Sequence, residues 1–145
     1  MEALLPIRQA PRRADVIQLL ESAALPTSDL TDDHMEDFFY VGPAGAPIGI
    51  VGVQFYGTDA LLRSLVVLPA HRAQGVGQRL VERAEQHARQ RGAVTLYLLT
   101  TTAESFFRSR DYVAIPRGDA PPAIRSTPEF ASLCPASSAF MSKRL

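Results

Sequence analysis

The segment from Leu61 to Arg91 constrains the fold of this chain more than any other stretch. It begins with an apolar run, Leu61 to Leu68, which is short enough for a buried strand and stops at Pro69, where the backbone N–H needed for strand pairing is missing. A turn containing Gly75 and Gly77 follows. Apolar residues then recur at helical spacing with charged residues between them: Val76, Leu80, Val81 and Ala84. The segment predicts a strand, a turn and an amphipathic helix, in that order.

A helix that starts at a glycine-containing turn offers a site for an anion, usually a phosphate. Its first N–H groups have no partner inside the helix, and the helix dipole favours negative charge there. Glycine at positions 75 and 77 removes Cβ atoms that would hold a phosphate away. No Gly-Lys-Ser/Thr follows, and one of the three glycines of the dinucleotide fingerprint is missing, which argues against a kinase or a dehydrogenase. The alternative is a tight turn whose glycines serve packing alone.

The turn and its flanks resemble motif A of the GCN5-related N-acetyltransferases, the GNAT family. In that family a strand ending in Val-x-Pro precedes an Arg/Gln-x-x-Gly-x-Gly/Ala turn that holds the diphosphate of acetyl-CoA. Here the strand ends in Val67-Leu68-Pro69, and the turn reads Arg72-Ala73-Gln74-Gly75-Val76-Gly77. The resemblance implies acetyl-CoA as cosubstrate, without a metal. It assigns cofactor contacts to Leu65, Val66, Val67, Arg72, Ala73, Gln74, Gly75, Val76, Gly77, Gln78, Thr100 and Phe107.

The resemblance also implies the GNAT fold, an α/β architecture. Its central mixed sheet has about seven strands, including a splayed pair of parallel strands, and four to five helices flank it. The residue pattern supplies matching elements: strands at 3–9, 38–41, 47–56, 61–68, 94–99, 112–115 and 139–143, and helices at 11–23, within 28–37, 76–91, 103–110 and 127–133. Gly49 and Gly52 lie inside a strand, where they predict a bulge or a close ligand approach.

The proton donor of this chain departs from the family pattern. Aligning the family's second signature, Asn-x-x-Ala-x-x-Phe-Tyr, on Ala103 places Thr100 at the asparagine and Phe107 at the tyrosine. That tyrosine often protonates the departing CoA thiolate, and phenylalanine cannot do so. The replacement candidates are Cys134, with Ser64 and Tyr112 as weaker ones; a solitary cysteine is otherwise a small buried hydrophobe. By the same resemblance the Val67 N–H faces the thioester oxygen.

The C-terminal tail, Pro116 to Leu145, is the segment in which we expect acceptor specificity to lie. Residues 117–135 read Arg-x-x-Ala-Pro-x-x-Ile-x-x-Thr-x-x-Phe-x-x-Leu-Cys-Pro, which resembles the arsenic-resistance branch of the family, itself similar to amino-acid N-acetyltransferases. The resemblance implies a small, amino-acid-like amine as acceptor. A planar guanidinium suits the carboxylate of such a molecule, and the candidates are Arg63, Arg117 and Arg125, each of which is otherwise a surface or ion-pair arginine.

A second group of charges lies in the acidic stretch from Ser28 to Asp37. Its carboxylates are expected either to attract an ammonium group or serve as a base, or to be solvated helix-end charges: Asp29, Asp32, Asp33, Glu36 and Asp37.

Composition limits the remaining possibilities. A chain of 145 residues fits a single domain, 1–145, and its 15 basic and 15 acidic residues cancel, so charge gives no reason to propose nucleic acid or a membrane as partner. One cysteine excludes an internal disulfide, and no signal or membrane-length apolar segment appears, which predicts a cytoplasmic protein, either a monomer or a homodimer. The alternatives to a small-molecule acetyltransferase are a non-catalytic acetyl-CoA sensor and a protein N-acetyltransferase.

Overall fold

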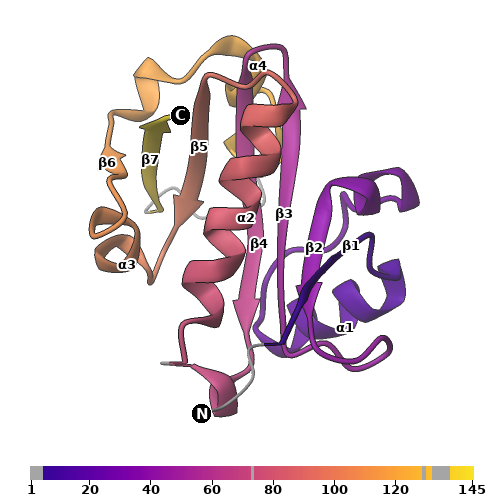
Figure 1. The fold of residues 1–145 in the computed structure, drawn as a ribbon. Helices are drawn as coiled ribbons and strands as arrows, with labels where there is room; N and C mark the ends of the chain where they lie inside the picture. The colour runs from indigo at the N-terminus through magenta and orange to yellow at the C-terminus, as the bar shows by residue number, and fades with distance from the viewer. Residues whose placement is uncertain (1–4, 73, 129, 132–137) are drawn as a thin grey trace.

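The computed structural model describes residues 5–72, 74–128, 130–131 and 138–145, and its centre is a seven-stranded sheet (Figure 1). The elements in chain order are β1 (Ile7–Gln9), α1 (Arg13–Ser22), η1 (Asp32–Asp37), β2 (Phe38–Val41), β3 (Gly49–Tyr56), β4 (Asp59–Val67), η2 (Pro69–His71), α2 (Val76–Gln90), β5 (Thr95–Thr100), α3 (Glu104–Arg108), β6 (Val113–Ala114), η3 (Arg117–Asp119), α4 (Pro122–Arg125) and β7 (Ala139–Arg144).

The strand order is β1-β2-β3-β4-β5-β7-β6. Strands β1 to β4 form an antiparallel meander, β4 and β5 are parallel, and β7 pairs antiparallel with both β5 and β6. The parallel pair is joined through α2, because parallel neighbours need a crossover connection. The predicted mixed α/β fold is therefore confirmed. The insertion of the last strand, β7, between β5 and β6 is an addition that the sequence pattern did not predict.

Strands β4 and β5 separate before they end. Their pairing runs only from Asp59 opposite Thr95 to Leu61 opposite Tyr97, although β4 continues to Val67 and β5 to Thr100 (Figure 1). Beyond Leu61 the facing edges of the two strands are no longer joined to each other. This is the splayed parallel pair that the family resemblance implied.

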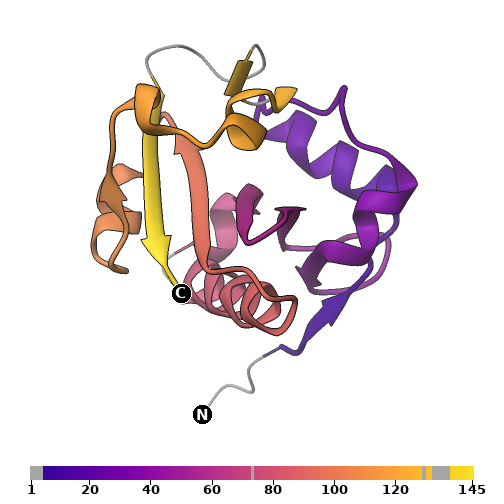
Figure 2. The ribbon, with the colours of Figure 1, turned by 90° about the horizontal axis from the view of Figure 1, so that it is seen from above.

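Helices cover both faces of the sheet. Figure 2 shows α2 on one side, with α1 and the orange tail segment on the other. The amphipathic face of α2 packs on the sheet through Val76, Leu80, Val81, Ala84 and Ala88. On the opposite face, α1 packs on Phe38, Ile50 and Val66, and α4 packs its Ile124 near Leu61 and Phe140. None of the helices within the described residues is long and apolar enough to cross a membrane.

A bulge is present, but its extra residue belongs to β4 and not to β3, where Gly49 and Gly52 had predicted a bulge or a close ligand approach. Gly52 pairs with Arg63 and Ile50 with Val66, so the single residue Val51 faces two residues of β4, Ser64 and Leu65. Ser64 adopts a left-handed φ of 60°.

Gly52, next to the bulge, is required for packing. A Cβ there would lie 2.4 Å from the ring of Phe38, so the glycine makes room for an aromatic side chain and not for a ligand.

The tail differs most from the sequence prediction. A short helix, α4, begins with Pro122 at its first turn, where the missing N–H costs nothing, and the pattern had not indicated a helix there. The helix expected at 127–133 and the strand expected at 3–9 lie partly outside the described residues. Helix α3 is shorter than the expected 103–110, because it ends at Arg108.

Candidate active site

A cavity of about 570 Å³ occupies the gap where β4 and β5 diverge. Its lining comes from β4 (residues 61–65), the end of β5 and the loop after it (98–103), the end of α1 and its loop (Leu20 and 24–26), and two further residues, Phe107 and Ser138. The volume lies in the range of small-molecule sites. The cavity therefore lies where β4 and β5 no longer pair with each other.

The glycine turn stands at the end of β4, as predicted. Gly75 caps α2 with a φ of 79°, and no atom lies within 4 Å of the position that its Cβ would take. Within the described part of the chain, no protein group accepts a hydrogen bond from the N–H groups of residues 74–78. Arg72 ties the turn to the strand, because its Nε donates to the Val67 carbonyl at 3.1 Å. The turn thus has the open amides that an anion site needs.

The predicted cofactor residues of β4 point in different directions. Leu65 lines the cavity, whereas Val66 is buried against the α1 cluster and Val67 packs toward the α2 cluster. Any ligand contact of the buried Val66 therefore involves its main chain. Ala73 lies outside the described residues.

Two predicted cofactor residues lie on the opposite wall. Thr100 lines the cavity, and its Oγ1 accepts a 3.0 Å hydrogen bond from the Ala103 N–H, so it also fixes the turn before α3. Phe107 also lines the cavity, with its ring 5.1 Å from Phe106 and 5.3 Å from Tyr112 in edge-on contacts. The residue at the family's tyrosine position thus borders the cavity but offers no proton.

Arg63 is the one charged side chain among the described residues that line the cavity, and it is only 7% exposed. Both of its terminal nitrogens bond to the carboxylate of Asp29, NH2 at 3.0 Å. Its Nε donates to Ser64 Oγ at 3.0 Å. The cavity wall therefore carries a neutral ion pair joined to a hydroxyl group.

The other two candidate arginines do not line the cavity. Arg117 donates to the carbonyls of Phe130 (3.1 Å) and Ser138 (3.4 Å) and lies over the Phe130 ring. Arg125 donates to the carbonyls of Gly118 (2.8 Å) and Ala120 (3.2 Å). Both side chains hold segments of the tail together.

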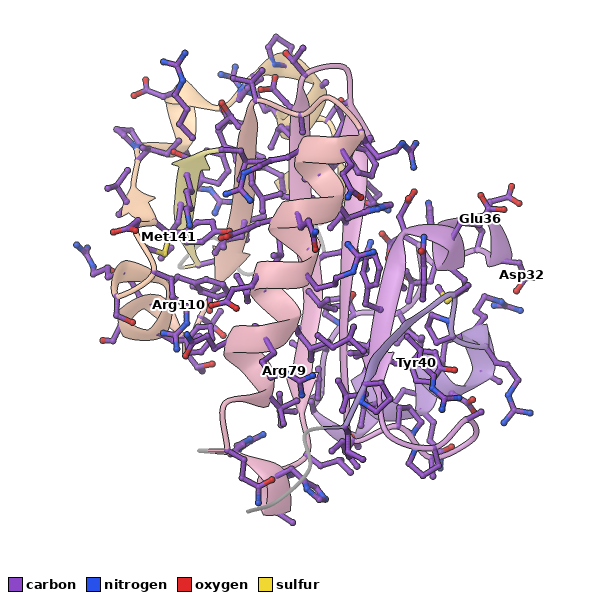
Figure 3. The ribbon with its side chains drawn as sticks, viewed as in Figure 1. Asp32, Glu36, Tyr40, Arg79, Arg110 and Met141 are labelled. Atoms are coloured by element: carbon purple, nitrogen blue, oxygen red, sulfur yellow. The ribbon has the colours of Figure 1, made fainter. Side chains whose placement is uncertain are left out.

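Among the five carboxylates of the acidic stretch, Asp29 alone is paired with a residue of the cavity wall. Asp32, Asp33 and Glu36 are exposed, and Figure 3 shows Asp32 and Glu36 projecting outward at η1. Asp37 pairs with His87 at 2.8 Å and with Arg91 at 2.9 Å. Within the described residues, no group of three or more His, Cys, Asp or Glu side chains gathers as metal ligands do.

Of the three proton-donor candidates, Ser64 lines the cavity, and the other two are Tyr112 and Cys134. Tyr112 is buried away from the cavity and donates to Glu85 at 2.8 Å; burial, and then the Glu85 charge, raise the pKa of its hydroxyl above the usual range. Cys134 lies outside the described residues.

Sequence patterns missed Ser138. It is 6% exposed, lines the cavity, and its Oγ bonds to no group of the described protein. Ser138 precedes the last strand without any motif, so no signal in the chain marks it.

The chain resembles known acetyltransferases. The model of the acetyltransferase (GNAT) family matches residues 3–113. An uncharacterised N-acetyltransferase of Chlorobaculum tepidum is 36% identical over 84 residues, 57% of this chain and 54% of that protein. An amino-acid acetyltransferase of Pseudomonas fluorescens is 33% identical over 103 residues, 68% of this chain and 24% of the relative. The chain thus spans about half, or less, of the curated relatives it matches.

A solved structure supports the fold. The N-acetylglutamate synthase of Neisseria gonorrhoeae, complexed with coenzyme A and N-acetyl-glutamate, matches with a TM-score of 0.81 at 22% identity, over all of this chain and 36% of the synthase chain. The predicted cosubstrate, acetyl-CoA, fits both the open amides of α2 and this family. Because the family model covers most of the chain and the fold agrees with it, this protein belongs to the acetyltransferase (GNAT) family.

Proposed function

We propose that this chain transfers the acetyl group of acetyl-CoA directly to the primary amine of a small, amino-acid-like acceptor. The observation that carries the proposal is the joint presence of open amides at the start of α2 and a cavity between β4 and β5. Acetyl-CoA supplies the activated acetyl group, so the protein mainly has to orient two substrates, which accounts for a large part of the rate enhancement in such reactions.

The proposed cofactor contacts follow from these features. The N–H groups of residues 74–78, with Arg72 and Ala73, would hold the diphosphate. The main chain of Leu65, Val66 and Val67 would pair with the pantetheine arm, as the family resemblance implies. Thr100 and Phe107, which line the opposite wall, would flank the arm.

The proposed catalytic groups are three. The Val67 N–H would donate to the thioester oxygen, a role that rests on the family resemblance. A hydroxyl or thiol would donate to the departing sulfur, either Ser64 or Cys134. Ser64 has the stronger support because it lines the cavity.

The proposed acceptor is zwitterionic. Arg63 would attract its carboxylate, and the adjacent Asp29 would attract its ammonium group before deprotonation. Arg117 and Arg125 would act on the acceptor through the tail that they hold together. Likeness to amino-acid acetyltransferases supports this acceptor class. We further propose an amino-acid-like arsenical as acceptor, in arsenic resistance, on the strength of the 117–135 pattern alone.

The test mixes the protein with acetyl-CoA and a panel of amino acids, simple amines and arsenical amino acids, and records free thiol release and the acetylated product by mass. Gly75→Trp should abolish CoA binding, because the indole would occupy the diphosphate position. Gly92→Trp is the matched control, since Gly92 lies at the other end of α2 with positive φ and open space around its Cβ position. If both variants bind CoA as the parent does, the anion site is wrong.

One observation favours a second function. Phe107 occupies the family's tyrosine position without a hydroxyl, which suits a chain that binds acetyl-CoA as a sensor and does not turn it over. Tight CoA binding by calorimetry, with no thiol release across the whole panel, would select the sensor.

A further inference from the structure

We propose that the Ser64 hydroxyl relays a proton from the attacking amine to the departing sulfur, and that Arg63 and Asp29 are positioning residues that hold this hydroxyl in place. The inference rests on the proposed function and adds the Asp29–Arg63–Ser64 chain of hydrogen bonds to it.

The backbone at Ser64 is held in an unfavourable conformation. Its φ of 60° lies in the left-handed region, which is unfavourable for a residue with a Cβ atom. Such a conformation persists only where the surroundings enforce it, and such residues gather at functional sites. Here the bulge opposite Val51 enforces it and brings Ser64 Oγ next to Arg63, its neighbour along β4.

The chemistry of Arg63 decides whether the Ser64 hydroxyl donates or accepts in the hydrogen bond between them. A guanidinium can only donate, so Ser64 Oγ accepts from Arg63 Nε at 3.0 Å. A serine hydroxyl has two acceptor sites and one donor. One acceptor site is used, which leaves the second acceptor site and the hydrogen for other partners. Because Ser64 lines the cavity, substrate atoms placed there can supply those partners.

Asp29 fixes the guanidinium itself. It lies 34 residues from Arg63 in the chain and receives both terminal nitrogens, so the arginine is held as a fork and its Nε is directed at Ser64. The pair is largely buried, with side-chain exposures of 5% for Arg63 and 10% for Asp29. A buried guanidinium without this carboxylate would be an unpaired charge and would destabilise the fold, so we treat Arg63 and Asp29 as one functional unit.

The step balances without another acid or base. The neutral amine nitrogen bonds to the acetyl carbon, the carbon–sulfur bond breaks, and the sulfur keeps the electron pair. Ser64 Oγ passes its own proton to the departing sulfur and then takes one proton from the nitrogen, so the products are an amide, a thiol and an unchanged serine. The Arg63 donor stabilises the negative charge that gathers on Oγ between these transfers.

The first experiment needs no turnover. CoA is bound to the protein, and ionisation of its thiol is followed by thiolate absorbance as the pH is raised. A hydroxyl that donates to the sulfur favours the thiolate, so Ser64→Ala should raise the pH of ionisation by about one unit. Ser138→Ala is the matched control, because Ser138 is a serine that also lines the cavity, and its titration should equal that of the parent.

Two results of the titration would overturn the proposal: an unchanged ionisation in Ser64→Ala, or a shift in Ser138→Ala alone. Failure of the parent protein to bind CoA would instead refute the proposed function, so the two failures are distinguishable.

The second experiment asks whether Arg63 acts through Ser64. Arg63→Lys keeps a positive charge beside Asp29, so folding, checked by the thermal midpoint, should survive. Lysine has no Nε, so the hydrogen bond to Ser64 is lost. We expect kcat to fall about 100-fold in Ser64→Ala and about 10-fold in Arg63→Lys, at the lower end of what acid–base groups contribute. In the Ser64→Ala background, Arg63→Lys should cost less than about twofold more. Losses that simply multiply would show that Arg63 does not act through Ser64 and would overturn its positioning role.

Discussion

The hydroxyl of Tyr112 lies 2.8 Å from Oε2 of Glu85, inside the core between α2 and the edge of the sheet. The ammonium group of Lys143, on β7, contacts the same carboxylate at 3.1 Å. One buried carboxylate therefore joins the crossover helix to the last strand, and both of its partners come from the C-terminal third of the chain. The contact gives Tyr112 a structural role, separate from the cavity.

Tyr112→Phe should lower the free energy of unfolding by about 2 kcal/mol, because Glu85 loses a buried donor. The kcat per folded molecule should stay within twofold of the parent. Chemical denaturation checks the expected change in stability, and steady-state kinetics checks kcat. A large loss of kcat in a well-folded variant would instead show that Tyr112 is catalytic.

The same residue predicts a dependence on alkaline pH. Burial raises the Tyr112 pKa, so the folded state keeps a proton that the unfolded state releases above about pH 10. The free energy of unfolding of the parent should fall as the pH rises above that value, and that of the Phe variant should fall less steeply. The difference between the two slopes against pH should correspond to about one proton. Equal slopes in the two proteins would contradict the assignment.

Phe107→Tyr should not create or raise acetyl transfer by more than about twofold. The ring is 3% exposed and packed edge-on against two aromatic neighbours, so an added hydroxyl lacks a prepared partner. Thiol release measured beside the parent tests this. A rise of tenfold or more would show that the family's tyrosine had been restored and that no other donor operates.

Gly52→Ala should destabilise the protein by about 2 kcal/mol or more, because its Cβ would lie 2.4 Å from the Phe38 ring. Gly118→Ala is the matched control: nothing lies within 4 Å of its Cβ position, and the expected change is within about 0.5 kcal/mol. Equal thermal midpoints for both variants would mean that Phe38 moves aside freely.

Arg117→Lys should loosen the tail. Lysine loses the planar group that lies over Phe130 and the two-pronged contact with the carbonyls of Phe130 and Ser138, which costs about 1 kcal/mol. We expect KM for the acceptor to rise several-fold while Kd for CoA stays unchanged. A rise in the CoA Kd of similar size would place Arg117 at the cofactor instead.

The sequence by itself determined the unit from β4 through the glycine turn and α2 to β5. Its signals are local: Pro69 ends a strand, Gly75 takes a left-handed φ, and the apolar stripe of α2 has to face a sheet. Such features depend on neighbours a few residues away, so a pattern in the chain is enough to predict them. The family followed from the same stretch.

Only the tertiary structure decided which side chains meet at the cavity. Asp29 and Arg63 are 34 residues apart, and their pairing depends on how α1 and its loop pack on the sheet. The sequence offered three arginines as candidates, and the fold placed one of them, Arg63, on the cavity wall. Contacts of this kind depend on packing between distant segments, which neither periodicity nor spacing along the chain encodes.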